Sequence, residues 1–255
     1  MTIPDARLEA RGKELTASIV FLTRLPFART KPIAGADIAQ AAWAFPIAGV
    51  LVGLIGALVY VLAHRLGLPA WPAATLTVAA TLAATGCLHE DGLADTADGF
   101  GGGETRERKL DIMRDSRIGT YGVCALAMSI LLRVSAVASL ADPELVVPAL
   151  VAAHGAARAT MPVFMFLVPP ARRDGLSFDV GAPPRTSVMI AGALGILILL
   201  ICLGPALGIS ALILLLIAIA LMAWLSLAQI EGQTGDVLGA IEQVSEIVIL
   251  LVALR

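Results

Sequence analysis

The chain has 255 residues, of which 58% are hydrophobic and only 15% are charged, and its formal net charge is −2. A soluble domain is usually about half apolar and about a quarter charged, so this much apolar surface cannot be hidden in one water-soluble core. We therefore expect lipid to solvate the remainder, and the charge gives no reason to expect a nucleic-acid partner.

The N-terminal segment, residues 1–40, is expected to be cytoplasmic. Its first 14 residues are charged and mixed, and no short apolar core with a small-residue cleavage site follows them, so we expect no cleaved signal peptide. Leu15–Phe27 is predicted to form an amphipathic helix that lies on the membrane surface.

Seven apolar stretches approach the roughly 20 residues needed to cross a bilayer. They are Ala41–Ala63, Ala70–Leu88, Gly119–Leu140, Leu145–Val168, Thr186–Leu203, Leu207–Ile230 and Val237–Leu254. The last carries two glutamates and is a span, a half-span or an interfacial helix. The sequence thus predicts an all-α, polytopic transmembrane helical bundle of six spans and a candidate seventh, forming a single integral membrane domain.

The basic residues predict which side each loop occupies, because cytoplasmic loops are rich in Lys and Arg. With these spans, 14 of the 18 basic residues fall on one side, in residues 1–40, 89–118 and 171–185. Two fall on the other side or at the C-terminus, and Arg133 and Arg158 lie inside spans. We expect a multi-pass protein of the cell inner membrane with its N-terminus and both long loops in the cytoplasm.

The predicted loop His89–Ile118 contains the most informative residues. Asp91, Asp95 and Asp98 are spaced i, i+4, i+7, which on a helix places them within an arc of roughly 60°. Carboxylates without cysteine favour a hard cation such as Mg²⁺, which typically takes one or two protein carboxylates plus water and phosphate oxygens. The spacing therefore predicts a magnesium site for a phosphorylated or diphosphate substrate.

Two neighbouring residues are further candidates for this site. Glu90 projects about 100° away from Asp91 on a helix, so it is either a further metal-site carboxylate or a solvated charge. His89 is a candidate proton shuttle, and the alternative is a structural histidine.

Glycines and arginines follow the acids. Gly101 and Gly102 belong to a glycine run whose N–H groups can approach phosphate oxygens, although a flexible loop explains the run equally well. Arg114 and Arg117 precede the return into the membrane and are candidate phosphate ligands.

Five charged or titratable residues lie inside predicted spans, where charge is costly and is usually functional or paired. His154 and Arg158 share one helix face, and Glu242 and Glu246 share another. A structural ion pair between the two helices is the alternative to a functional role. The remaining residue of this set is Arg133.

Five segments together resemble the cobalamin synthase family, also called adenosylcobinamide-GDP ribazoletransferases. The specific pair is HEDGLADTADG followed by KLDIMRDSRIGTYG. The weaker matches are FLTRLPF at Phe21–Phe27, FPIAG at Phe45–Gly49 and GQTGDVLGAIEQVSE at Gly232–Glu246. The matches extend from about residue 20 to the C-terminus and thus cover nearly the whole chain.

The resemblance implies an enzyme that joins adenosylcobinamide-GDP to α-ribazole, or to its 5′-phosphate, and releases GMP, with Mg²⁺ as cofactor. It implies that Asp91, Asp95 and Asp98 hold metal and that Arg117, and secondarily Arg114, neutralise diphosphate charge. Asp236 and Glu246 would complete the site or act as base, and Arg158 fits the pattern of the family. Glu90 departs from that pattern, because many members have an apolar residue there. Further partners compatible with the resemblance are the bilayer, a second copy of the chain and other cobalamin-assembly enzymes.

Two other classes of protein share some of these features. A CDP-alcohol phosphotransferase needs an Asp three residues before the Asp-Gly pair and an Arg after the Ala, whereas this chain has Leu88 and Asp95 at those positions. A secondary transporter would use the charges inside the spans as coupling sites, but the chain shows no paired broken helices in matching halves.

Overall fold

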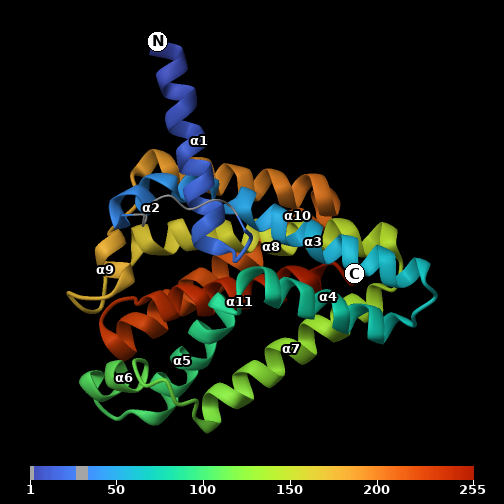
Figure 1. Ribbon diagram of the computed structural model, residues 1–255. Coiled ribbons are helices and arrows are strands. Elements are labelled where there is room, and N and C mark those ends of the chain that lie inside the picture. The colour runs from blue at the N-terminus through green and yellow to red at the C-terminus, as the bar shows by residue number, and fades with distance from the viewer. Residues whose placement is uncertain (1–2, 27–33) are drawn as a thin grey trace.

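The computed structural model describes residues 3–26 and 34–255, and all regular elements in these ranges are helical (Figure 1). The helices are α1 (Ile3–Leu22), α2 (Gly35–Ala41), the 3₁₀ turn η1 (Ala42–Ala44), α3 (Phe45–Arg65), α4 (Ala70–Thr85), α5 (Leu88–Gly102), α6 (Arg106–Ile112), α7 (Thr120–Leu140), α8 (Pro143–Leu167), α9 (Leu176–Val180), α10 (Arg185–Ile230) and α11 (Gly235–Val252). The all-α prediction is confirmed.

Helix α11 lies in the middle of the bundle, in contact with α5, α7, α8 and α10 (Figure 1). Most of its residues are buried, including both glutamates. The predicted stretch Val237–Leu254 is therefore a helix enclosed by other helices. This helix is not among the helices of the described chain that are long and apolar enough to be candidate spans.

Helices α3 and α8 pack closely because α3 presents glycines to α8. A Cβ at Gly49 would overlap the carbonyl of His154, and a Cβ at Gly53 would lie 2.7 Å from the Leu150 carbonyl oxygen. The small-xxx-small pair thus brings two backbones together, as such pairs do in membrane helices.

Helix α10 contains the fifth and sixth predicted spans as two arms. Gly204, at φ 76°, breaks the helix before Pro205, a backbone conformation that glycine adopts without strain. A Cβ at Gly208 would lie 3.0 Å from the Leu199 carbonyl oxygen. In one continuous helix, residues nine positions apart would be separated by ~13 Å along the axis. The arms therefore form a hairpin.

The second predicted span, Ala70–Leu88, is shorter than expected. Helix α4 ends at Thr85, and Gly86 and Cys87, both at positive φ, turn the chain by 90° into α5. The long loop predicted after this span is in fact α5 and α6, joined to α7 by a short connection. The bend directs the acidic residues away from the axis of α4.

Several helices of the described chain are long and apolar enough to cross a membrane: four, or five if the bent pair α4 and α5 is one span. Their outward faces are apolar, with exposed Leu58 on α3, Leu131 on α7 and Trp224 on α10. Such contiguous apolar surface is typical of lipid contact.

The N-terminal helix α1 extends from residue 3 to Leu22 and ends before the predicted limit, Phe27, which lies outside the described residues together with Arg29 and Lys31. Its last turns pack on the bundle, where the buried Ser18 hydroxyl donates to the Ala41 carbonyl.

Candidate active site

The acidic segment of the sequence folds as α5, so the i, i+4, i+7 spacing of its aspartates does place them on one helix. The three then differ in surroundings. Asp98 is buried, and its carboxylate accepts hydrogen bonds from the N–H groups of Gly119 (2.7 Å) and Gly122 (2.9 Å) at the start of α7. Asp98 thus caps α7, while Asp91 is exposed and Asp95 is half-buried.

Two cavities meet at Asp91. The inner cavity, of about 170 Å³, is lined by residues of α1, α2, α3, α5, α8, α9 and α11 together with Arg172. The outer cavity, of about 470 Å³, lies between α4, α5, α7 and the segment Met113–Ile118. Asp91 lines both, and Asp95 lines the outer one.

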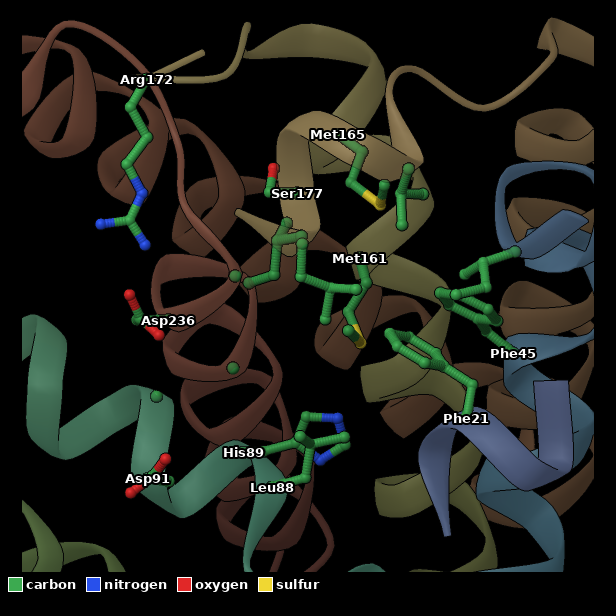
Figure 2. Close-up of a pocket in the computed structure, with 17 residues that line it drawn as sticks. Phe21, Phe45, Leu88, His89, Asp91, Met161, Met165, Arg172, Ser177 and Asp236 are labelled. Atoms are coloured by element: carbon green, nitrogen blue, oxygen red, sulfur yellow. The ribbon is translucent and has the colours of Figure 1, made fainter. Parts of the chain in front are cut away.

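Asp236, in the first turn of α11, lines the inner cavity on the same side as Asp91 (Figure 2). Glycines allow this approach, because a Cβ at Gly92 would lie 2.7 Å from the Asp236 carbonyl oxygen and one at Gly239 would lie 3.0 Å from the His89 carbonyl oxygen. The two predicted acidic segments, about 140 residues apart in sequence, therefore form one site.

These acids crowd one another. Burial, with the carboxylates of Asp91, Asp236 and Asp98 nearby, raises the pKa of Asp95 to about 7. Burial also raises the pKa of Asp236. Among the described residues, Asp91 and Asp95 form no ion pair with a Lys, Arg or His side chain. Unpaired carboxylates at a cavity wall are suited to a hard divalent cation.

Arg172 is a residue of this site that the sequence did not single out. Figure 2 shows its guanidinium directed toward Asp236 at the edge of the inner cavity. Its buried Nη1 has no hydrogen-bond partner in the described structure. A guanidinium with free donors beside a carboxylate site is a candidate phosphate ligand.

The backbone explains why Arg172 lies there. Gln233 donates to the Pro169 carbonyl and Ala171 donates to the Gln233 carbonyl, both at 2.8 Å, so the segments before α9 and α11 pair as an isolated β-bridge. The Arg106 side chain donates to the carbonyls of Ala171 and Ile230 and fastens the same junction. The sequence alone does not predict this long-range pairing, and so it gave no reason to place Arg172 in the site.

The two arginines predicted from sequence are placed less centrally. Arg114 lines the outer cavity, but its guanidinium donates to the Asp174 carboxylate at 2.6 Å. Arg117 pairs with Asp115 at 2.7 Å, lines neither cavity, and its side chain is 87% exposed. The hydrogen bonds from Arg117 lower the pKa of Asp115 to about 2.

Gly101 and Gly102 end α5 and do not form a free loop. A Cβ at Gly101 would lie 2.7 Å from the Tyr121 ring, so this glycine allows α5 to pack against α7. Neither residue lines either cavity.

A buried ionic cluster lies on the other side of α5 and α11. Its members are Glu90, Arg133, His154, Arg158, Glu242 and Glu246. Arg133 contacts Glu90 at 2.9 Å and Glu246 at 3.3 Å, whereas Arg158 contacts Glu242 at 2.6 Å. Three members of this cluster were predicted as site residues: Glu90, Arg158 and Glu246. None of the three lines the inner cavity, and only Glu90 lines the outer one.

His89 connects the cluster to the inner cavity. Its Nδ1 lies 3.4 Å from both the Glu242 carboxylate and the Arg158 guanidinium, while its buried Nε2 has no hydrogen-bond partner among residues 3–26 and 34–255. The ring itself lines the inner cavity (Figure 2).

His154, Glu242 and Glu246 have ligand atoms within 4.8 Å of one another, which a metal ion could bridge. The guanidinium groups of Arg133 and Arg158 already contact these carboxylates and supply the positive charge. The charges of the cluster are therefore balanced by ion pairing between helices, although Arg133 Nε and Nη2, Arg158 Nε and Glu90 Oε2 have no hydrogen-bond partner among the described residues.

Comparison with known proteins places the chain in a family. The family model described as cobalamin-5-phosphate synthase matches residues 14–254. The chain belongs to this family. A relative named adenosylcobinamide-GDP ribazoletransferase from Bradyrhizobium diazoefficiens is 61% identical over 94% of this chain and 92% of its own length. One of the same name from Mesorhizobium japonicum is 52% identical over 99% of this chain and 98% of its own length. No solved structure matches significantly.

This member of the cobalamin-5-phosphate synthase family carries two sets of acids on the same two helices, α5 and α11. Asp91, Asp95 and Asp236 line cavities. Glu242 and Glu246 are held by arginines inside the bundle.

Proposed function

We propose that the chain is an adenosylcobinamide-GDP ribazoletransferase, which transfers the cobinamide phosphate from adenosylcobinamide-GDP to α-ribazole, or to its 5′-phosphate, in the last step of cobalamin assembly. Family membership and the name shared by its relatives support this activity. The structural observation that supports it best is Asp91, which lines two cavities of different size, as a site that joins two substrates requires.

Magnesium fits the acids of this site. Asp91 and Asp95 would hold the ion, with Asp236 close by, and substrate phosphate oxygens and water would complete its ligands. When bound, Mg²⁺ would stabilise the charge that develops on the diphosphate. Asp98 is engaged at the start of α7 and is the weakest of the predicted ligands.

Side chains of the inner cavity can perform the remaining chemistry. Arg172, with free donors, would bind a non-bridging phosphate oxygen. The ribazole 3′-hydroxyl oxygen would form a bond to the phosphorus on the cobinamide side. The bond from that phosphorus to the bridging oxygen would break, and GMP would leave with the electron pair. Asp236, whose pKa is raised, is placed to accept the hydroxyl proton.

We further propose a topology of six spans: α3, α4, α7, α8 and the two arms of α10, with α11 enclosed among them. The acid-bearing α5 and α6 would then lie on the side that holds 14 of the 18 basic residues. Because cytoplasmic loops are rich in Lys and Arg, this side would be the cytoplasmic side of the cell inner membrane.

The test is incubation of the purified chain with adenosylcobinamide-GDP, α-ribazole and Mg²⁺, followed by detection of GMP and adenosylcobalamin. Both products are expected in equal amounts, and excess chelator should stop their formation. Asp111→Asn is a matched control, because Asp111 is an exposed acid of α6 that lines neither cavity. Absence of product from folded wild-type protein would reject the activity, and full turnover in chelator would reject the metal.

A further inference from the structure

We propose that the inner cavity binds the aromatic base of α-ribazole, and that His89 Nε2 donates a hydrogen bond to the imine nitrogen of that base. This assignment rests on the proposed function, since it names where one of the two substrates lies. It divides the site into a nucleoside side, the inner cavity, and a corrinoid side, the outer cavity.

Size is the first reason. An engineered cavity of about 150 Å³ in another protein binds one benzene ring, so the inner cavity, at about 170 Å³, suits one small planar ring system. A corrinoid macrocycle is several times larger and cannot enter. The larger, more open outer cavity faces the same Asp91 from the other direction and is the side from which the cobinamide diphosphate can reach it.

Shape and polarity of the wall are the second reason. Figure 2 shows Phe21, Phe45, Met161 and Met165 gathered at one end of the cavity, with the acids and Arg172 at the other. Aromatic faces and methionine sulfur pack well on a flat ring. A nucleoside whose base fills the apolar end therefore has its ribose at the acidic end, where its hydroxyl must react.

Polarity also distinguishes the two bases that the reaction brings to the enzyme. Guanine carries donors and acceptors along most of its edge, and burial against an apolar wall would leave them unpaired at a high cost in free energy. The dimethylbenzimidazole base of ribazole has one hydrogen-bonding atom, its imine nitrogen, because its other nitrogen is bonded to the sugar and carries no hydrogen. It therefore needs only one hydrogen-bond donor from the wall.

His89 supplies one suitable polar atom. The residue is 2% exposed, its ring lines the inner cavity, and its buried Nε2 has no hydrogen-bond partner in the described part of the chain. Its Nδ1 lies 3.4 Å from both the Arg158 guanidinium, which can only donate, and the Glu242 carboxylate. The Glu242 oxygens already contact Arg158 at 2.6 Å and accept from the Gln243 amide at 3.0 Å, which leaves Arg158 as the partner of Nδ1. A neutral imidazole whose Nδ1 accepts from Arg158 carries its hydrogen on Nε2, so the free atom is a donor. The buried ionic cluster thus fixes the orientation of the ring.

The first test enlarges side chains of the apolar end from two different helices, with Met165→Trp on α8 and Ile38→Phe on α2. We expect KM for α-ribazole to rise about tenfold or more, while KM for adenosylcobinamide-GDP changes by less than about twofold. Met189→Trp is the control, because Met189 lies exposed on α10 and lines neither cavity. An unchanged KM for α-ribazole, or a rise confined to adenosylcobinamide-GDP, would overturn the assignment.

The second test uses wild-type protein and so does not depend on whether a variant folds. Free 5,6-dimethylbenzimidazole should inhibit competitively against α-ribazole and not against adenosylcobinamide-GDP. For the hydrogen bond, wild-type protein should bind α-ribazole about tenfold more tightly than the corresponding indole riboside, which lacks the imine nitrogen. His89→Phe should abolish that preference. Competition of the free base with adenosylcobinamide-GDP would contradict the base site. If His89→Phe kept the wild-type preference for α-ribazole over the indole riboside, the role of His89 would be wrong.

These outcomes are separable from failure of the proposed function. If wild-type protein forms no GMP, the transferase activity is wrong. If it forms GMP normally but the filled cavity and the free base leave α-ribazole kinetics unchanged, only the location of the base is wrong.

Discussion

Glu90 and Asp91 are adjacent on α5, yet they belong to opposite kinds of environment. Glu90 also lines the outer cavity, but it is buried and held by Arg133 at 2.9 Å. Asp91 is exposed, lines both cavities and has no ion-pair partner among the described residues. The same contrast recurs on α11 between Glu246, held by Arg133 and His154, and Asp236, which faces the inner cavity. Two helices thus carry one structural and one chemical set of acids.

The difference teaches that pairing, more than charge, identifies the functional carboxylates here. Buried acids paired with arginine are neutralised by it and hold helices together, although such pairs add little net stability relative to apolar residues. Acids that crowd one another at a cavity wall are tolerated at a cost that a bound cation can offset. Each set should therefore respond differently to neutralisation.

Asp91→Asn should have the largest effect on catalysis. We expect at least about a thousandfold loss of GMP release, or roughly 4 kcal/mol of transition-state stabilisation. The thermal midpoint in detergent should stay within a few degrees of wild type, since the side chain supports no helix contact. Initial rates and thermal unfolding of the same preparation measure both, and a variant that keeps near-normal turnover would remove Asp91 from the site.

Arg133→Met should break the other set. It leaves Glu90 and Glu246 buried without their cation, which costs about 3–5 kcal/mol of folding free energy, so we expect a much lower thermal midpoint and poor recovery from membranes. Arg65→Met, at an exposed arginine of α3, is the control. If Arg133→Met were as stable as the control but inactive, the cluster would be catalytic and the contrast between the two sets would fail.

Gly92→Ala tests the contact that joins the two helices. The new methyl group would lie 2.7 Å from the Asp236 carbonyl oxygen, so it should push α5 from α11 at a cost of about 1–3 kcal/mol and reduce GMP release by separating Asp91 from Asp236. Gly192→Ala is the matched control, because a Cβ there meets nothing within 4 Å. Equal activity in the two variants would show that the spacing of the helices is unimportant.

Asp98→Asn should have the smallest effect on catalysis among the changes at these acids. It weakens two hydrogen bonds to the start of α7 and should cost about 1–2 kcal/mol of stability, with turnover of the folded fraction within about tenfold of wild type. Asp95→Asn should do the reverse, with loss of activity and little change in thermal midpoint. Loss of activity without loss of stability in Asp98→Asn would make Asp98 a metal ligand.

Much of this arrangement was predictable from local pattern. The apolar stretches predicted the long helices, and the i, i+4, i+7 spacing placed Asp91 and Asp95 on one helix, because helical periodicity is a local property. The pairing of His154 and Arg158 with Glu242 and Glu246 was also among the alternatives, since buried charges need partners.

Other features depend on contacts between distant segments. The role of Asp98 at the start of α7 and the position of Arg172 beside Asp236 both arise from tertiary packing, which spacing along the chain does not encode. The glycines at 101 and 102 predicted a phosphate-binding loop, but α5 continues through them because close packing on Tyr121 also requires a small residue. The 90° bend after α4 likewise shortened a predicted span.

The most direct test of the contrast between the two sets of acids is Mn²⁺ binding, followed by electron paramagnetic resonance on purified protein without substrate and with adenosylcobinamide-GDP. We predict one site that tightens with the diphosphate substrate, weakens at least about tenfold in Asp91→Asn and Asp95→Asn, and is unchanged in Asp111→Asn. Mn²⁺ binding that survives both cavity substitutions, or that is lost only when Glu242 is replaced by Gln, would contradict the account and move the metal into the buried ionic cluster.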